Sequence, residues 1–341
     1  MKPIDLAEKG LAPDWLIRRG IRQLLKRRLN DEFERDPERR AARTQALMNE
    51  LAGSAIAIET DAANEQHYEV PAAFYQLALG ARLKYSSALY PPGVSSLDQA
   101  EEAMLEASCA QAELVDGQRI LELGCGWGSL TLWMASQYPE SRITAVSNSA
   151  SQRAFIESRA LELGLHNVKV ITCDVNELSL DERFDRVVSV EMFEHVRNYR
   201  ELLKRIAGWL NPGGKLFVHI FCHRYLAYPF ETEGDGNWMG RYFFTGGLMP
   251  AADTLLHFQD DLALEDRKLY SGMHYARTSR AWLENVDRRR DQARQVMREI
   301  YGDESDIWLQ RWRMFFMACE ELFAYDDGNA WLVAHYRFRR R

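Results

Sequence analysis

The chain has 341 residues, of which 46% are hydrophobic and 27% are charged, and its formal net charge is −7. These proportions are ordinary for a globular protein, and an acidic chain lacks the global basic field that binds nucleic acid. The length suits about two domains, or one large domain with additions. No run approaches the ~20 apolar residues of a membrane-spanning helix.

Five cysteines are scattered without a Cys-x-x-Cys pair, so neither a zinc-ligand spacing nor a disulfide framework is indicated. Residues 1–5 contain no apolar stretch typical of a secretory leader. We therefore expect a reduced, cytoplasmic location and no metal.

Residues 12–60 are predicted to be helical, because apolar residues recur there at helical spacing between arginines and lysines. A basic amphipathic helix can lie on an anionic membrane. More often such a helix packs on its own protein or on a dimer mate, and we favour packing. The charged run 31–43 is predicted to be a solvated helix.

Residues 64–75 and 84–90 are rich in aromatic and hydroxyl side chains, a composition that suits a cap over a ligand site. A helix predicted over 97–114 leads from them into the segment Arg-Ile-Leu-Glu-Leu-Gly-Cys-Gly-Trp-Gly at 119–128. This segment predicts a buried strand and a glycine loop, and Ser129 suits the start of a helix. The glycines let the backbone approach a ligand, and the helix N-terminus offers free N–H groups.

The spacing of the glycines distinguishes between different classes of ligand-binding loop. Dinucleotide dehydrogenases carry G-x-G-x-x-G, and phosphate-binding loops need a following Gly-Lys-Ser/Thr. Here the pattern is G-x-G-x-G, and Glu122 stands two residues before the first glycine. That combination resembles the first motif of class I S-adenosylmethionine-dependent methyltransferases.

Further strands are predicted at 143–146, 168–171, 184–190 and 216–221, with helices at 149–163 and 198–210 between them. This alternation predicts an α/β fold with a doubly wound parallel sheet. Ligands bind beyond the carboxyl ends of such strands. Ser147, Asp174 and Glu191 follow or end three of these strands, so we expect them to face one crevice.

The remaining residues are predicted to form additions to this core. Residues 222–261 are rich in aromatic side chains and predict an inserted substrate lid. A strand is predicted at 262–268, helices at 280–301 and 306–324, and a last, antiparallel strand at 331–338.

The segment Glu191-Met-Phe-Glu194-His195 brings two carboxylates and an imidazole to the crevice. Methyl transfer needs an aligned nucleophile, and an aliphatic amine must also lose a proton to a base. The alternative to a catalytic role is that the two acids only stabilise a helix N-terminus through its dipole. His195, His219 and His223 show no recognised metal-ligand spacing.

Four segments together resemble the cyclopropane-fatty-acyl-phospholipid synthase superfamily of S-adenosylmethionine-dependent enzymes, closest to its coclaurine N-methyltransferase-like branch. The four are Glu-Leu-Gly-Cys-Gly-Trp-Gly at 122–128, Val-Ser-Val-Glu-Met-Phe-Glu-His-Val at 188–196, Tyr-Ser-Ser at 85–87 and His-Tyr-Ala-Arg-Thr at 274–278. The likeness continues through 13–17, 61–70, 241–247 and 331–335.

The resemblance implies a class I methyltransferase fold with a seven-stranded sheet. Its parts would be an N-terminal helical extension (1–63), a helical cofactor cap (64–118) and a core (119–341) with an inserted helical lid at about 222–261. S-Adenosylmethionine would be the cofactor. The residues implied to bind it are Tyr85, Ser86, Glu122, Gly124, Gly126, Ser147, Asn148, Gln152, Asp174, Val175 and Glu191.

The resemblance also implies two catalytic arrangements. In the N-methyltransferases the bases match Glu194 and His195, with Glu191 as a third member. In the cyclopropane synthases a bicarbonate ion is the base, and Glu194, His219 and Tyr275 match three of its four ligands. The fourth, a cysteine, falls on Ser87, which favours amine methylation.

We therefore expect N-methylation of a small amine. Modification of unsaturated acyl chains at a membrane and S-methylation of a thiol are the alternatives, and a non-catalytic binding protein is least favoured. Peripheral membrane contact is not favoured, and the basic N-terminal helix could serve a homodimer.

Overall fold

A computed structural model describes residues 2–58, 70–234 and 236–341. The expected boundary between extension and cap, at residues 63 and 64, lies outside the described residues, as do residues 61–69 of the matched segment 61–70. Within the described ranges, no helix is long and apolar enough to cross a membrane.

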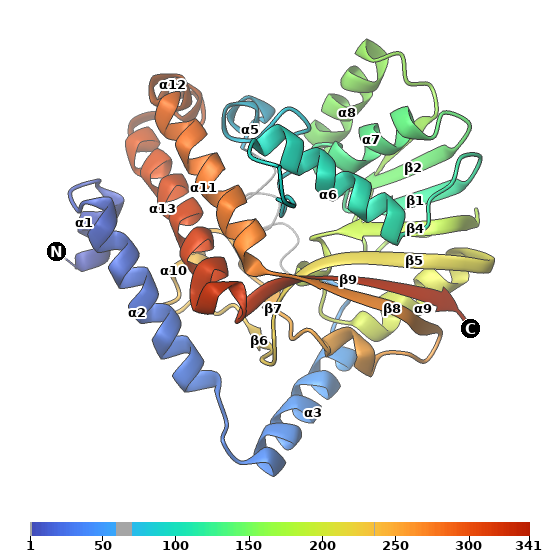
Figure 1. The fold of residues 1–341 in the computed structure, drawn as a ribbon, viewed down its shortest axis with the longest axis horizontal. Helices are drawn as coiled ribbons and strands as arrows, with labels where there is room; N and C mark the ends of the chain where they lie inside the picture. The colour runs from blue at the N-terminus through green and yellow to red at the C-terminus, as the bar shows by residue number, and fades with distance from the viewer. Residues whose placement is uncertain (1, 59–69, 235) are drawn as a thin grey trace.

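The core is a seven-stranded sheet in the order β3-β2-β1-β4-β5-β9-β8 (Figure 1). The five strands β1 to β5 run parallel, and β9 is antiparallel to both β5 and β8. This confirms the predicted doubly wound fold and the antiparallel last strand. The strands are β1 (Arg119–Leu123), β2 (Arg142–Ser147), β3 (Val168–Thr172), β4 (Phe184–Val190), β5 (Leu210–His223), β8 (Leu262–Tyr270) and β9 (Trp331–Arg340).

Helices cover both faces of the sheet, because the apolar side chains of its strands point alternately to each side. Ile120, Val188 and Phe217 pack under one layer, whereas Leu121 and Val187 pack under the other. Figure 1 shows α6 and α7 on the first face and α9 on the second. The helices of these layers are α6 (Leu97–Gln111), α7 (Ser129–Gln137), α8 (Ala150–Glu162) and α9 (Tyr199–Trp209), and the short helix α5 (Ala72–Ala78) precedes them.

The N-terminal extension consists of α1 (Pro3–Glu8), α2 (Asp14–Glu32) and α3 (Pro37–Gly53). The prediction of one helix through 31–43 is wrong at residues 33–36, where the chain turns. Asp36 caps α3 by accepting the backbone N–H groups of Glu38 and Arg39. Proline is favoured at the first position of a helix and an aspartate is favoured as its cap, so these two residues start a new helix.

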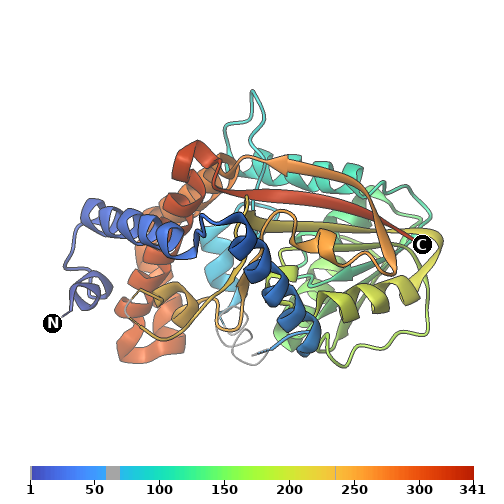
Figure 2. The ribbon, with the colours of Figure 1, turned by 90° about the horizontal axis from the view of Figure 1, so that it is seen from below.

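Helix α2 packs on the C-terminal half of its own chain (Figures 1 and 2). Ile17 is buried, and Ile21 packs against the same apolar cluster. The Arg18 guanidinium bonds to Glu320 at 2.7 Å and to Glu321 at 3.0 Å. Helix α2 therefore packs on its own chain through apolar and ionic contacts.

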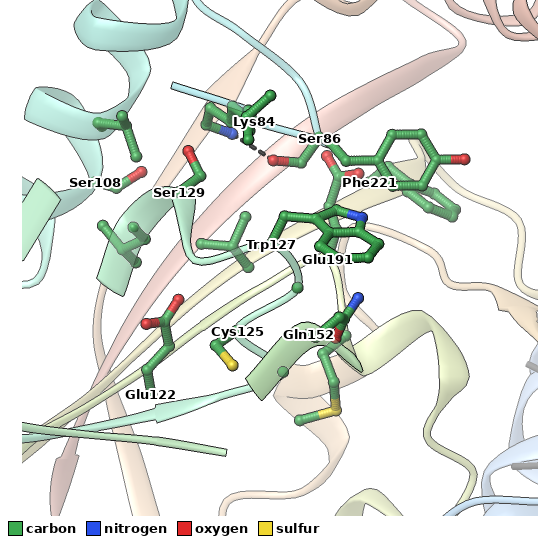
Figure 3. A pocket seen from close by; sticks show the side chains of 18 of the residues that line it. Lys84, Ser86, Ser108, Glu122, Cys125, Trp127, Ser129, Gln152, Glu191 and Phe221 are labelled. Atoms are coloured by element: carbon green, nitrogen blue, oxygen red, sulfur yellow. Dashed lines mark hydrogen bonds between the residues drawn. The ribbon is translucent and has the colours of Figure 1, made fainter. Parts of the chain in front are cut away.

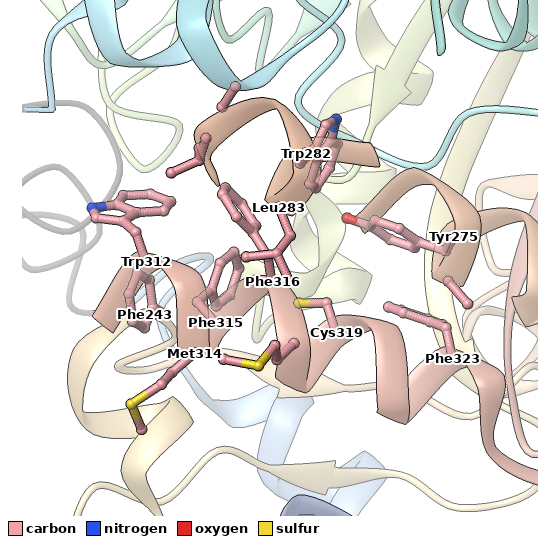
Figure 4. Packing of buried hydrophobic residues seen from close by; sticks show 14 of the residues in the cluster. Phe243, Tyr275, Trp282, Leu283, Trp312, Met314, Phe315, Phe316, Cys319 and Phe323 are labelled. Atoms are coloured by element: carbon pink, nitrogen blue, oxygen red, sulfur yellow. The ribbon is translucent and has the colours of Figure 1, made fainter. Parts of the chain in front are cut away.

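Three helices after β8 form a second aromatic core beside the sheet: α11 (Gly272–Arg288), α12 (Arg290–Tyr301) and α13 (Ser305–Ala324). The helix predicted from residue 280 instead begins at Gly272 and breaks at Arg289. Trp282, Trp312 and Phe316 are buried between these helices (Figure 4).

In the described part of the insert after β5, the chain forms a short helix and a two-stranded ribbon. Its elements are β6 (Tyr228–Pro229), α10 (Trp238–Tyr242), β7 (Leu248–Met249) and the 3-10 turn η2 (Thr254–His257). Phe244 of this insert reaches the cavity described below, as do Tyr275, Trp282 and Phe315. Helices α11 and α13 therefore provide more of the wall than the insert does.

Candidate active site

Two adjoining cavities open at the carboxyl ends of the parallel strands. The first comprises about 1020 Å³ of empty space and the second about 700 Å³, and both volumes include space that is open to solvent. Their shared lining includes Gly124, Gly126, Gln152, Met192 and His195. Together they form an elongated site at the place where ligands bind in open α/β sheets.

The three glycines of the loop have different tasks, although all have positive φ. A Cβ on Gly124 would lie 2.6 Å from Met192, and one on Gly128 would lie 2.7 Å from Ile156. A Cβ on Gly126 would meet nothing within 4 Å. Gly124 and Gly128 therefore allow close packing, whereas Gly126 leaves open space beside the cavities.

Besides the shared Gly124, Gly126 and Gln152, the second cavity is lined by four more of the predicted cofactor residues, Ser147, Asn148, Asp174 and Val175. They lie where β2 and β3 end. The Ser147 hydroxyl donates to Gln152 Oε1 at 2.7 Å, and Asp174 Oδ1 accepts the N–H of Asn176 at 2.7 Å. These bonds hold both polar side chains at the rim.

The first cavity brings together Tyr85, Ser86 and Glu122. Figure 3 shows the polar side chains that surround it. The Glu122 carboxylate accepts the hydroxyl of Thr131 at 2.5 Å, and burial raises the pKa of Glu122 to about 8. A basic side chain also lines this cavity: Lys84, which the sequence analysis did not single out, is buried there.

Glu191 is the centre of the polar network. Its carboxylate accepts the Ser87 N–H at 2.9 Å and the Tyr275 hydroxyl at 2.7 Å, and it lies 3.1 Å from His219 Nε2. Burial raises the pKa of Glu191, and the positive charge of Lys84 opposes that shift. Its φ of 48° is costly for a residue with a side chain, and such strain is typical of functional sites.

A second histidine supports the first. His219 Nδ1 lies 2.9 Å from His335 Nε2, and both rings are buried. Burial lowers the pKa of both histidines well below the usual value, so both are neutral. If His219 Nε2 donates to Glu191, its Nδ1 must accept the proton of His335. His335 Nδ1 is then unprotonated, which fits its lack of a partner among the described residues.

The three ionisable residues of the Glu-Met-Phe-Glu-His segment point in different directions. Glu194 is fully buried and absent from the lining of both cavities, and its Oε1 accepts the Phe221 N–H at 2.7 Å. Burial raises the pKa of Glu194 well above its usual value. His195 lines both cavities, stacks on Phe244 at 5.6 Å, and has a pKa lowered to about 4 by burial. The first cavity is thus lined by Glu191 and His195 but not by Glu194.

Residues 57–332 match the family model of mycolic acid cyclopropane synthetase. The chain belongs to this family. The (S)-coclaurine N-methyltransferase of Papaver somniferum is 36% identical over 338 residues, which are 98% of this chain and 96% of that protein. The cyclopropane-fatty-acyl-phospholipid synthase of Escherichia coli (strain K12) is 28% identical over 276 residues, 80% of this chain and 67% of that enzyme.

Solved structures of the family agree. Coclaurine N-methyltransferase bound to N-methylheliamine and S-adenosylhomocysteine superimposes with a TM-score of 0.95 at 35% identity, covering 98% of both chains. A cyclopropane synthase from Mycobacterium tuberculosis has a TM-score of 0.71 at 20% identity, covering 84% of this chain and all of that one, which shows the common fold. This family member is an S-adenosylmethionine-dependent methyltransferase.

The cavities fit that cofactor. Gly126 leaves space for a ligand against the backbone, and the buried hydroxyl of Ser129 has no protein partner within the described part of the chain. The second cavity offers Asp174 and Ser147 to an adenosine, and the first offers Glu122 to a charged tail.

Proposed function

We propose that this protein methylates the nitrogen of a small amine, with Glu191 as the base. The observation that carries the proposal is the position of the Glu191 carboxylate, which lines the first cavity and is held by Ser87, His219 and Tyr275. Three contacts from three separate parts of the chain keep this carboxylate in one orientation.

Such a base is required because an aliphatic amine is mostly protonated near neutral pH and then has no free lone pair. In the proposed step one N–H proton of the bound ammonium passes to the Glu191 carboxylate, and the lone pair of the nitrogen becomes free. Burial favours this transfer because it raises the proton affinity of Glu191. The neutral imidazole of His195 lies on the same cavity and can accept a hydrogen bond from the amine.

S-Adenosylmethionine supplies the electrophilic methyl group when it is bound. Ser147, Asn148, Asp174 and Val175 would hold its adenosine part in the second cavity. Gln152 lines both cavities and would lie near their junction. These residues would hold the cofactor in position and exclude water. Methyl transfer depends mainly on such alignment of the reacting groups.

The acceptor would lie against an aromatic wall. Phe221, Phe244, Trp282 and Phe315 line the first cavity together with Tyr275. Aromatic rings suit an apolar or aromatic amine and can hold an ammonium by cation–π attraction. The names of the relatives, which include coclaurine and pavine N-methyltransferases, point to the same class of acceptor.

The contacts of Ser87, His219 and Tyr275 support modification of an acyl chain less well than methylation of an amine. In the synthases that the chain resembles, a bicarbonate is held by residues at the positions of Ser87, Glu194, His219 and Tyr275. Here the Ser87 N–H, His219 and Tyr275 all bond to Glu191 instead. A side-chain carboxylate thus occupies the centre of these groups and takes the contacts that a bound anion would need.

The proposal is tested by transfer of a labelled methyl group to three sets of acceptors. These are amines of benzylic and tetrahydroisoquinoline type, small thiols, and unsaturated phospholipid vesicles with and without bicarbonate. We expect label in the amines, and no dependence on bicarbonate. Label confined to the thiols or to the vesicles would overturn the proposal.

A further inference from the structure

Lys84 is a buried cation that forms no ion pair with a carboxylate among the described residues, although the charges of Glu191 and Glu101 act on it from farther away. It is 2% exposed, and its Nζ donates to the Ser86 hydroxyl at 2.5 Å and to the Ser87 carbonyl at 2.8 Å. No carboxylate of the described residues lies within 4.0 Å of Nζ. An ammonium has three N–H donors, and burying one without an ion pair is costly.

The surroundings of Lys84 indicate where the missing anion would lie. Lys84 and Ser129 line the same cavity, and Figure 3 shows both side chains at one end of it. The Ser129 hydroxyl is buried and has no hydrogen-bond partner among the residues that the structure describes. Ser129 is also the first residue of α7, and a helix N-terminus favours negative charge.

We propose that Lys84 binds the α-carboxylate of the methionine part of S-adenosylmethionine, together with the hydroxyls of Ser86 and Ser129. This carboxylate is the only anionic group of the cofactor. With the adenosine part in the second cavity, the amino-acid part must lie in the first, which Lys84 lines. Glu122 lines that cavity too, and its carboxyl oxygens can accept a hydrogen bond from the α-ammonium.

The rival role for Lys84 is electrostatic. Its charge lowers the pKa of Glu191, and it could be retained only to tune that carboxylate. The two roles make different predictions for ligand binding. If Lys84 only tunes Glu191, its loss should not change the affinity for S-adenosylhomocysteine measured without an amine. The inference rests on the cofactor alone, and its test needs no amine. Failure of the proposed acceptor would therefore leave it intact.

The test is calorimetric titration of the full chain with S-adenosylhomocysteine and with 5′-methylthioadenosine, which lacks the amino-acid part. We expect Lys84→Met to weaken S-adenosylhomocysteine binding by about 10- to 100-fold, the range for a charged hydrogen bond. We expect 5′-methylthioadenosine to bind both proteins equally, and Lys84→Arg to restore part of the loss. The exposed Lys204 of α9 provides the control variant Lys204→Met.

Equal weakening of both ligands, or of neither, would overturn the proposal. A normal affinity combined with a slower methyl transfer would assign Lys84 to the tuning of Glu191. If Lys84→Met does not fold, the same question is tested on the unaltered protein by comparing its affinities for two ligands. Removal of the carboxylate alone, in decarboxylated S-adenosylhomocysteine, must then cost the same 10- to 100-fold, and equal binding of the two ligands would refute the assignment.

Discussion

Glu191→Gln and Glu194→Gln form a matched pair that tests which carboxylate is the base. Each change replaces a buried carboxyl group by an amide of the same shape. In Glu191 the amide oxygen can still accept from Ser87 and His219, which both bond to Oε1, and the amide nitrogen can donate to the Tyr275 oxygen. In Glu194 the amide oxygen can still accept from Phe221. Both variants should therefore fold.

The expected effects on the rate differ widely. An amide cannot take a proton, so Glu191→Gln should lower kcat by about 10²- to 10⁴-fold, the usual contribution of a general base. Burial raises the pKa of Glu194 well above its usual value, and Glu194 lines neither cavity. We therefore expect Glu194→Gln to lower kcat by less than about fivefold, a loss near 1 kcal/mol.

The assay is methyl transfer to the best amine found in the acceptor screen, at saturating cofactor, with the melting temperature of each variant as the control for folding. If Glu194→Gln lost as much activity as Glu191→Gln at an unchanged melting temperature, the assignment of the base from geometry would be refuted. The same holds if Glu191→Gln kept most of its activity.

Three further expectations concern the loop, the histidine pair and pH. Gly128→Ala should lower the free energy of unfolding by more than about 1 kcal/mol, because its Cβ would meet Ile156 at 2.7 Å; Gly126→Ala has open space and should lose cofactor affinity in calorimetry with a smaller loss in a urea melt. His335→Phe removes the hydrogen-bond donor to His219 and should lower kcat about tenfold. His335→Gln can still donate a hydrogen bond to His219, so we expect it to keep the wild-type kcat. Since the pKa of Glu191 is raised and the carboxylate is the active form, kcat should fall as the pH is lowered through that pKa; His195 has a pKa of about 4, so His195→Asn should keep this acid limb in a pH–rate profile.

Much of the fold could be predicted because its signals are local. The strand at 119–123 lies at the predicted bounds, and the helix start at Ser129 follows from the glycine loop before it. The predicted crevice residues lie along one edge of the sheet, with Ser147 and Asp174 in the second cavity and Glu191 in the first, because the carboxyl ends of neighbouring parallel strands share that edge. The turn at 33–36 was missed although Pro37 signals it, since the charged run continues the helical pattern on both sides.

The partners of Glu191 could not be predicted from spacing. His219 faces His335 because β5 and β9 pair in antiparallel register, and residues more than a hundred positions apart become neighbours only once that register is known. Tyr275 reaches the site because α11 begins earlier than its pattern indicates. Lys84 directly precedes the matched Tyr-Ser-Ser segment. Lysines are mostly exposed to solvent, so the burial of Lys84 beside a cavity could not be predicted from the sequence.

The choice between Glu191 and Glu194 shows most directly what the backbone adds to a motif. The two residues are three positions apart, and the resemblance implies Glu194 as the base with Glu191 as a third member. Glu191 takes a left-handed conformation at the end of β4, and the 3-10 turn Phe193–His195 follows it. That geometry directs Glu191 to the cavity and Glu194 to the backbone of β5. This bend lets a carboxylate and an imidazole line the same cavity, and strained backbone of this kind is typical of functional sites.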